Sequence, residues 1–450
     1  MPATLTAPLV VMKFGGSSVA NADRIRRVAQ RIARERARGS DLVVVVSAMG
    51  DTTDELLALA HAITDDPDPR ELDLLLGTGE HQSATLVSMA LHALDVEAIS
   101  LTGAQAGIST DGRYGKARIA DIDPRRVRGE IAAGRVVIVA GFQGIARTAT
   151  PVDGEASGDD RPAGAIPRET AADIAELTTL GRGGSDTTAV ALAARLGADR
   201  CQVFTDVKGI YTADPRLVPG ARQLPVIGYE EMLELAYQGA QVMNVRAVEL
   251  GWVNGVVIEV LSSFEDAPGT LIKEDPLVEQ RNKVRGIAHD RNVAKVTLVG
   301  VPDRPGVARS VFQPLADATI NVDMIVQNVG HGGSTDLSFT VPKVELAKAK
   351  RILEPIVREL GFREITTDSS VAKVSIVGAG IQNAPGYAAR MFGALADAGV
   401  NIEMISTSEV RITTIVAEDD VETAVRALHE AFSLETPDPV DASAAVAAPS

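Results

Sequence analysis

Short runs of β-branched apolar residues alternate along the first part of the chain with stretches of helical periodicity. Leu9 to Phe14 and Asp41 to Ser47 are runs of the first kind, and the residues between them recur at helical spacing as Ile25, Val28, Ala29 and Ile32. This order predicts a strand-helix-strand unit. The alternation continues with helical patterns at 83–94 and 187–196 and strand-like runs at 136–140, 202–205 and 256–260. It favours an α/β fold with a three-layer, mostly parallel sheet.

The last third of the chain contains an internal repeat. Val296 to Gly300 resembles Val374 to Gly378, and the segment that begins at Asn321 resembles the one that begins at Asn401. Each copy reads as a strand, a Pro-Gly turn, a helix and a second strand, with an offset of about 80 residues. Two sister domains are therefore expected, over residues 292–367 and 370–437.

The length of 450 residues also favours several domains, and residues 1–280 form the expected first one. Residues 145–175 are rich in Pro, Gly, Asp and Ala and predict a long surface loop within it. The Ala-, Pro- and Ser-rich stretch 438–450 is typical of a disordered tail.

The net charge and the cysteine content indicate which binding partners and which cellular compartment to expect. The net charge of -16 opposes binding to nucleic acid or to an anionic membrane, because both require a basic face. No segment reaches membrane-spanning length, and the N-terminus has no targeting signal. Cys201 is the one cysteine, which fits a reducing compartment such as the cytoplasm. The histidines lack metal-ligand spacing, so no bound metal is expected, and His81 and His92 are expected on a helix surface.

Two glycine-rich loops each follow a strand-like run and lead into a helix. The first, after Lys13, begins at Gly15, and the second spans Gly181 to Thr188 with Arg182 inside it. Glycine-rich backbone at a helix N-terminus beside a cation suits a phosphate. Each loop could also be a tight turn, the second capped by Ser185 or Asp186. Two such loops in one sheet domain favour the functional interpretation.

These residues suit phosphoryl transfer to a carboxylate. A carboxylate is already ionised at neutral pH, so the reaction needs cations and in-line positioning rather than a strong base. A lysine, an arginine and Mg²⁺ carried on ATP would stabilise the charge on the transferring phosphoryl group.

The motifs together resemble the aspartokinase family of amino-acid kinases. The resemblance rests on Lys13 to Val19, Val46 to Leu56, Gly79-Glu80, Ala140 to Gly144, Gly181 to Thr188, Thr205 to Arg216 and Ser262 to Ile272, in that order. It implies transfer of a phosphoryl group from ATP to the side chain of L-aspartate to give 4-phospho-L-aspartate. This is the first step of the pathway to lysine, threonine and methionine.

The resemblance also implies roles for single residues. Lys13, Arg182 and Asp186 are the implied catalytic residues. Glu80 would hold the substrate ammonium and Arg182 the α-carboxylate, with the rest of the substrate site formed by Ser47, Asp51, Thr52, Thr53, Gly183, Gly184 and Ser185. Besides Lys13, the implied nucleotide contacts are Phe14, Gly15, Gly16, Ser17, Thr205, Asp206, Tyr211, Arg216 and Gln241. Gln241 and Asn244-Val245 depart from the family, where a lysine and His-Pro are common.

The two repeats resemble tandem ACT domains, and the resemblance implies an α+β ferredoxin-like fold for each. The resemblance implies lysine, threonine or both as effectors, with contacts at Asp303, Gly306, Ala308, Asn321, Gln327 and Thr407, and assembly as a homo-oligomer or an α2β2-type complex. Alternatives stay open: another carboxylate kinase of this fold, such as a glutamate kinase, or a catalytically weakened sensor without the lysine at Gln241. The repeat itself could also be a purely structural dimerisation module.

Overall fold

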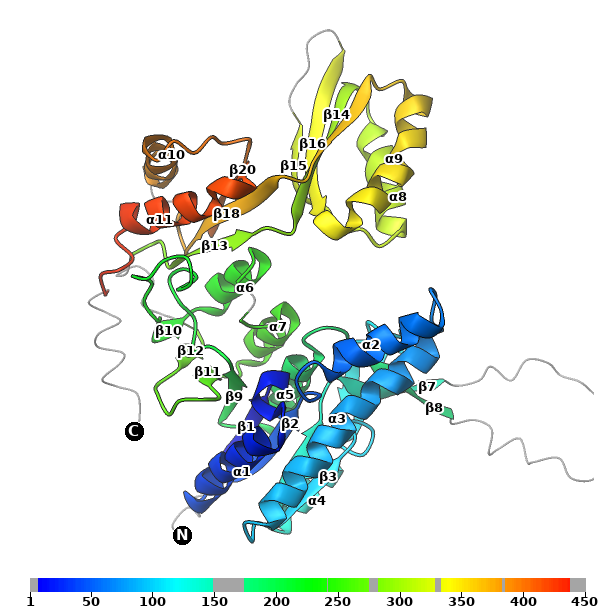
Figure 1. The fold of residues 1–450 in the computed structure, drawn as a ribbon, viewed down its shortest axis with the longest axis vertical. Coiled ribbons are helices and arrows are strands. Elements are labelled where there is room, and N and C mark those ends of the chain that lie inside the picture. Colours follow the sequence, from blue (N-terminus) through cyan, green and yellow to red (C-terminus); the bar gives the residue numbers. More distant parts are fainter. Residues whose placement is uncertain are drawn as a thin grey trace, which may run out of the picture. The chain divides into compact units, whose positions relative to one another are not determined.

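The computed structural model describes residues 7–148, 174–240, 242–274, 282–327, 333–382 and 385–437 (Figure 1). The chain divides into two compact units. The first contains residues 1–210, 225–229 and 242–274, and the second contains residues 211–224, 230–241 and 275–450. In the described part of the chain, no helix has the length and apolar character needed to cross a bilayer.

An eight-stranded sheet in the order β10-β12-β11-β9-β1-β2-β6-β3 forms the centre of the first unit. Its strands are β1 (Leu9–Phe14), β2 (Asp41–Val46), β3 (Ala98–Leu101), β6 (Val136–Ala140), β9 (Arg200–Thr205), β10 (Val226–Ile227), β11 (Ile258–Ser262) and β12 (Thr270–Ile272). The six strands from β11 to β3 are parallel, and β12 is antiparallel to β11. The predicted mostly parallel sheet is confirmed.

Helices pack on this sheet through the apolar positions that the sequence places at helical spacing. The helices of this unit are α1 (Ala22–Ala37), α2 (Thr52–Ile63), α3 (Pro69–His92), α4 (Arg125–Ala132), α5 (Gly184–Leu196) and α7 (Val245–Asn254). Ile25, Val28 and Ile32 of α1 are buried in one core with Val87 and Leu91 of α3. Helix α5 packs against β1, β2 and β9 and is buried along most of its length.

A second, four-stranded sheet in the first unit has the order β5-β4-β7-β8. Its strands are β4 (Ile108–Thr110), β5 (Ile119–Ile122), β7 (Gln143–Thr148) and β8 (Ile174–Thr179), and β7 pairs antiparallel with β8. The ends of the predicted 145–175 loop therefore lie in strands, because Ile145 pairs with Leu177 and Thr148 with Ile174. Residues 149–173, the rest of that prediction, lie outside the described residues, as does the predicted tail 438–450.

The second unit holds the two repeats, each with a four-stranded antiparallel sheet and two helices. The first sheet, β15-β16-β14-β17, consists of β14 (Val293–Pro302), β15 (Asp323–Gln327), β16 (Ser334–Pro342) and β17 (Glu364–Asp368), with helices α8 (Val307–Asp317) and α9 (Leu346–Leu360). The second sheet, β13-β18-β20-β19, consists of β13 (Gly286–Asp290), β18 (Val371–Val377), β19 (Met404–Thr407) and β20 (Arg411–Ala417), with helices α10 (Tyr387–Asp397) and α11 (Val421–Ala431). Helix α6 (Tyr229–Tyr237) precedes them.

Strand β13 completes the second repeat from outside it. It precedes the first repeat in the sequence, yet it pairs antiparallel with β18, with Gly286 opposite Val377 and Asp290 opposite Lys373. In the first repeat the corresponding edge is filled by β17, which follows that repeat's own second helix. The two repeats are therefore alike in architecture but differ in which part of the chain supplies the fourth strand.

The repeats contact each other through equivalent residues. Lys373 Nζ lies 2.8 Å from Asp323 Oδ2, and Lys295 Nζ lies 2.7 Å from Glu403 Oε2. The repeat aligns Lys295 with Lys373 and Asp323 with Glu403, so the two ion pairs are the same contact made in both directions. Between them, Val293, Met324, Val371, Met404 and Ile415 form a small shared core.

Candidate active site

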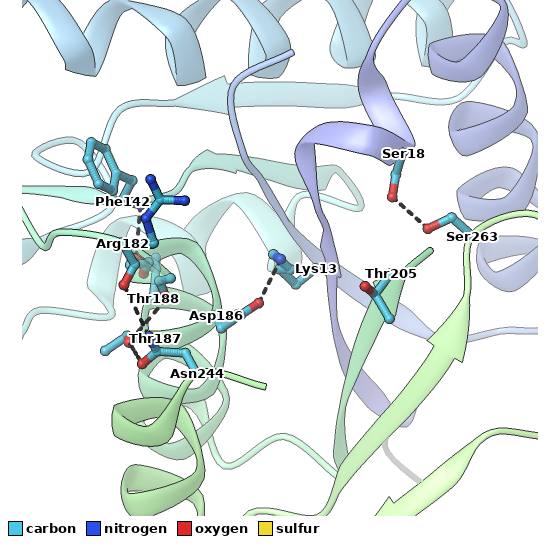
Figure 2. Close-up of polar contacts among 12 residues, drawn as sticks. Lys13, Ser18, Phe142, Arg182, Asp186, Thr187, Thr188, Thr205, Asn244 and Ser263 are labelled. Atoms are coloured by element: carbon cyan, nitrogen blue, oxygen red, sulfur yellow. Dashed lines mark hydrogen bonds and ion pairs between the residues drawn. The ribbon is translucent and has the colours of Figure 1, made fainter. Parts of the chain in front are cut away.

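The predicted phosphate loops meet where the central parallel strands end. Strand β1 ends at Lys13 and Phe14, and its neighbours β2 and β9 end at Val46 and Thr205. Lys13 Nζ lies 2.6 Å from Asp186 Oδ1, and both side chains are nearly buried (Figure 2). An ammonium group held in place by a carboxylate at this edge can neutralise a phosphate.

Backbone close contacts join the first glycine-rich loop to the segment after β2. The Gly16 carbonyl accepts a 3.0 Å hydrogen bond from Gly50 N. A Cβ atom at Gly16 would lie 2.9 Å from the Gly50 carbonyl oxygen and 3.0 Å from that of Ala48. Because even one methyl group would collide with backbone, this approach requires glycine.

The second glycine-rich loop enters α5 through Gly183, which has a φ of 73° and is the N-cap. The prediction of Ser185 or Asp186 as N-cap is wrong, since both already lie inside the first turn. Two buried contacts secure the turn: Thr188 Oγ1 accepts from Phe142 N at 3.2 Å, and Ser185 packs so closely on Gly141 that a Cβ there would lie 2.8 Å from its Oγ. The freed side chain of Asp186 faces Lys13 instead (Figure 2).

Arg182 is held by its backbone, whereas its side chain is exposed. Its carbonyl oxygen accepts a 3.1 Å hydrogen bond from Asn244 Nδ2, whereas its side chain is 94% exposed and lies 3.8 Å from Asp54 Oδ1. Figure 2 shows the guanidinium directed away from Lys13. The structure thus places Arg182 beside the site without joining it to the Lys13–Asp186 pair.

Glu80 is a buried carboxylate that lacks a full set of partners. Its Oε1 accepts a 3.1 Å hydrogen bond from Ala48 N, but Oε2 is buried without a hydrogen-bond partner among the described residues. Burial raises the pKa of Glu80 to about 7, against the hydrogen bond from Ala48, which favours the charged form. A buried oxygen of this kind is a ready acceptor for a cationic ligand group.

The other predicted substrate residues lie between β2 and α2. Ser47 follows β2 directly and its amide donates to the Phe14 carbonyl at 3.1 Å. Asp51 is the N-cap of α2 and is exposed, and Thr52 and Thr53 are half-buried in its first turn. These residues flank the segment that contacts Gly16 and Glu80.

The predicted nucleotide residues fall into both units. Phe14 and Phe204 stack with ring centroids 4.6 Å apart beneath the first loop, and the Ser17 carbonyl accepts a hydrogen bond from Arg24. Thr205 ends β9 and Asp206 follows it in the first unit, whereas Tyr211 and Arg216 belong to the second. Gln241 lies outside the described residues.

The predicted effector contacts are all exposed residues of the second unit: Asp303 and Gly306 between β14 and α8, Ala308 in the first turn of α8, Asn321 just before β15, Gln327 at its end, and Thr407 on β19. Of these, Asn321 lines a crevice of about 350 Å³ together with Asp323, Lys373, Glu234 and Arg411. The remaining five do not line it.

Asn244 has a structural role beside the site that the sequence analysis did not predict. It caps α7 by accepting from Arg246 N at 3.0 Å and donates to the Arg182 carbonyl, and a Cβ at Gly183 would lie 2.1 Å from its Nδ2. An Asn at a helix start is a capping signal that the sequence does contain. His81 also differs from expectation, since it is half-buried and its Nε2 lies 2.8 Å from Gln143 Oε1.

Among the described residues, no group of three or more His, Cys, Asp or Glu side chains could hold a metal ion.

Comparison with known proteins agrees with this geometry. Residues 8–251 match the amino acid kinase family, and residues 296–355 and 374–432 each match an ACT domain family. The aspartokinase of Mycolicibacterium smegmatis is 48% identical over 431 residues, which cover 95% of this chain and 96% of that protein. The crystal structure of E. coli aspartokinase III in complex with aspartate and ADP (R-state) aligns with a TM-score of 0.74 at 26% identity, over 94% of this chain and 99% of that chain.

The same E. coli enzyme in complex with lysine and aspartate (T-state) aligns with a TM-score of 0.69 at 26% identity, again over 94% of this chain and 99% of that one. The resemblance inferred from the motifs is thereby confirmed over both the first unit and the repeats. The chain belongs to the aspartokinases of the amino acid kinase family, with tandem ACT domains at its C-terminal end.

Proposed function

We propose that the protein transfers the γ-phosphoryl group of MgATP to the β-carboxylate of L-aspartate, giving 4-phospho-L-aspartate and ADP. The observation that carries this proposal is Glu80, whose buried Oε2 has no partner in the described residues. An α-ammonium group would supply the missing donor and the missing charge. The complex of the E. coli relative with aspartate and ADP supports the same substrates.

The proposed chemistry uses cations and needs no general base. The β-carboxylate oxygen attacks phosphorus while the bond to the ADP oxygen breaks, so no proton is transferred. Lys13 neutralises charge on the phosphoryl oxygens, with the backbone of Gly15, Gly16 and Ser17 beside it. Asp186 keeps the Lys13 ammonium at the end of β1 through their 2.6 Å contact.

Arg182 and the residues around it complete the proposed substrate site. Its exposed guanidinium would bind the α-carboxylate, while Glu80 binds the α-ammonium and leaves the side-chain carboxylate free to react. Ser47, Asp51, Thr52, Thr53, Gly183, Gly184 and Ser185 are proposed as the remaining substrate contacts, and Phe14, Thr205, Asp206, Tyr211, Arg216 and Gln241 as nucleotide contacts.

A hydroxamate assay tests the proposed activity. Hydroxylamine traps an acyl phosphate, so protein with ATP, Mg²⁺ and aspartate should give a coloured product, and glutamate in place of aspartate should give none. Absence of product with aspartate from folded protein would refute the proposal. Product with glutamate alone would favour another carboxylate kinase.

We propose further that lysine, threonine or both inhibit the enzyme through the ACT repeats. The lysine complex of the E. coli relative supports this, as does the exposure of the six proposed contacts: Asp303, Gly306, Ala308, Asn321, Gln327 and Thr407. Inhibition requires that the effector bind the less active state more tightly. Activity that is indifferent to lysine and threonine, singly and together, would make the repeats a structural module.

The proposed assembly is a homo-oligomer or an α2β2-type complex through the repeats. Strands β15 and β19 are sheet edges, and the equivalent residues Ile325 and Ile405 on them are 54% and 44% exposed. An open edge with exposed apolar side chains favours pairing with another chain. We also propose a cytoplasmic location, since one cysteine supports no disulfide framework within the chain, and we place the reaction at the start of lysine, threonine and methionine synthesis.

A further inference from the structure

Residues 211–224 belong to the second unit, although they directly follow a segment of the first. Within them, Ala213 and Val218 are buried in the hydrophobic core of the second repeat, together with Leu428 and Phe432 at the end of α11. The segment that contains Tyr211 and Arg216 is therefore packed as a part of the regulatory unit.

Thr212 fixes the start of this segment from two sides. Its carbonyl oxygen accepts a 2.8 Å hydrogen bond from Ile287 N on β13. Its hydroxyl oxygen accepts a 3.1 Å hydrogen bond from Arg222 N and lies 3.0 Å from His429 Nε2 on α11. Thr212 and His429 are both buried, so these polar atoms depend on each other as partners.

The direction of the contact follows from the protonation of the imidazole. Burial lowers the pKa of His429, opposed by nearby Glu435, so the ring is neutral near pH 7. We assign the proton of the neutral ring to Nδ1, which lies 3.8 Å from Glu435 Oε2. Nε2 is then the acceptor, and the Thr212 hydroxyl donates its hydrogen bond to it. Each of these groups then has a matching partner.

A second contact from the same helix face holds the middle of the segment. Arg426 Nε donates a 2.8 Å hydrogen bond to the Leu217 carbonyl. Arg426 and His429 are three residues apart and thus neighbours on α11. Between the two anchored positions, Arg216 is 87% exposed and is paired with Asp214, which presents it outward.

We propose that helix α11 of the second repeat holds the nucleotide-facing segment in its binding conformation, with His429 as a positioning residue for ATP. This rests on the proposed function, in which Tyr211 and Arg216 contact the nucleotide. A segment ordered in advance spares the entropy that binding would otherwise cost. The second ACT repeat then orders a segment that contacts the nucleotide, in addition to any effector it binds.

The test compares His429→Leu with His429→Gln and with Glu430→Gln, an exposed neighbour on α11. His429→Leu removes the hydrogen-bond acceptor and puts an apolar side chain in the same buried position. We expect its KM for ATP to rise about fivefold, as for one lost buried hydrogen bond, and its KM for aspartate to stay unchanged. The amide of His429→Gln offers a new acceptor and should restore part of the affinity. Glu430→Gln should match the original chain.

Hydrogen exchange of the full-length protein reports on the segment independently of activity. In His429→Leu, amides of residues 212–222 should exchange at least about fivefold faster, while those of β1 and α5 keep their rates. If His429→Leu does not fold, Arg426→Ala replaces it, since Arg426 is exposed and also anchors the segment.

Unchanged exchange in residues 212–222, or equal increases in both KM values, would overturn the inference. Lack of kinase activity in the unaltered protein would instead refute the proposed function. Faster exchange without any change in KM for ATP would show that α11 holds the segment but that the nucleotide does not use it, which also overturns the proposal.

Discussion

Replacing Glu80 by glutamine should remove a pH dependence of stability that the structure assigns to this residue. The side chain is 3% exposed, and burial raises its pKa from 4.5 to about 7. One pKa unit corresponds to about 1.4 kcal/mol, so the shift corresponds to about 3 kcal/mol. Because the folded pKa is the higher one, the contribution is fully present below pH 4.5 and is lost as the pH rises through about 7.

Trp252 provides the assay. It is the one tryptophan of the chain and lies on α7 in the first unit, so its fluorescence during urea unfolding reports on the unit that contains Glu80. Between about pH 5 and about pH 9, the stability advantage of the original chain over Glu80→Gln should fall by about 3 kcal/mol. Saturating aspartate should flatten this slope, because a bound ammonium group favours the charged carboxylate.

Steady-state kinetics should show that Glu80 also binds aspartate. Glu80→Gln should raise KM for aspartate by at least about thirtyfold, as for loss of about 2 kcal/mol from a buried charge pair, and leave KM for ATP nearly unchanged. Glu130→Gln is a matched control, since Glu130 is also buried but is paired with Arg126 and Arg135. Parallel stability curves for the original chain and Glu80→Gln would refute the reasoning.

Four further substitutions test the site, one of them in combination with another. Lys13→Ala should lower kcat by about a thousandfold and leave the circular dichroism spectrum unchanged, and an unaltered kcat would show that Lys13 is not catalytic. The double variant Lys13→Ala/Asp186→Asn should be more stable than Lys13→Ala alone, because it removes the unpaired buried carboxylate, but it should stay inactive. Asn244→Ala should lower the free energy of unfolding by about 1 kcal/mol, because helix α7 loses its N-cap. It should also raise KM for aspartate several-fold, because the Arg182 carbonyl loses its hydrogen bond. A change in stability without a change in KM would show that Asn244 has only a structural role. Gly16→Ala should abolish most activity, because the new Cβ would lie 2.9 Å from a carbonyl oxygen, and normal turnover would show that the loop can shift.

The parts of the fold that depend on local pattern could be predicted from the sequence. The apolar run Leu9–Phe14 forms β1 with its predicted bounds, and Ile25, Val28, Ala29 and Ile32 are buried on α1 as their helical spacing predicts. Alternation of strands and helices sufficed for the parallel sheet because short connections force neighbouring elements together. Lys13 and Asp186 could be proposed from the sequence because they adjoin glycine-rich loops, whereas Glu80 could be proposed only from the resemblance to the aspartokinase family.

Features that depend on contacts distant in sequence could not be predicted. Nothing local in 211–224 indicates that Ala213 and Val218 complete the core of a repeat whose first strand of its own begins only at Val371. The N-cap at Gly183 was missed because Ser and Asp are better capping residues, yet here Asp186 pairs with Lys13. In both cases tertiary packing overrides the local preference.

The strand that closes the second repeat limits how this region can be divided. A polypeptide starting after Asp290 would carry both helices and the other three strands of that repeat, but β18 would lack β13 and become an open edge of the sheet. An independently made regulatory fragment must therefore begin upstream of Gly286. In evolution, the second repeat cannot be transferred between proteins as one contiguous segment, because strand β13, which precedes the first repeat in the sequence, has to be transferred with it.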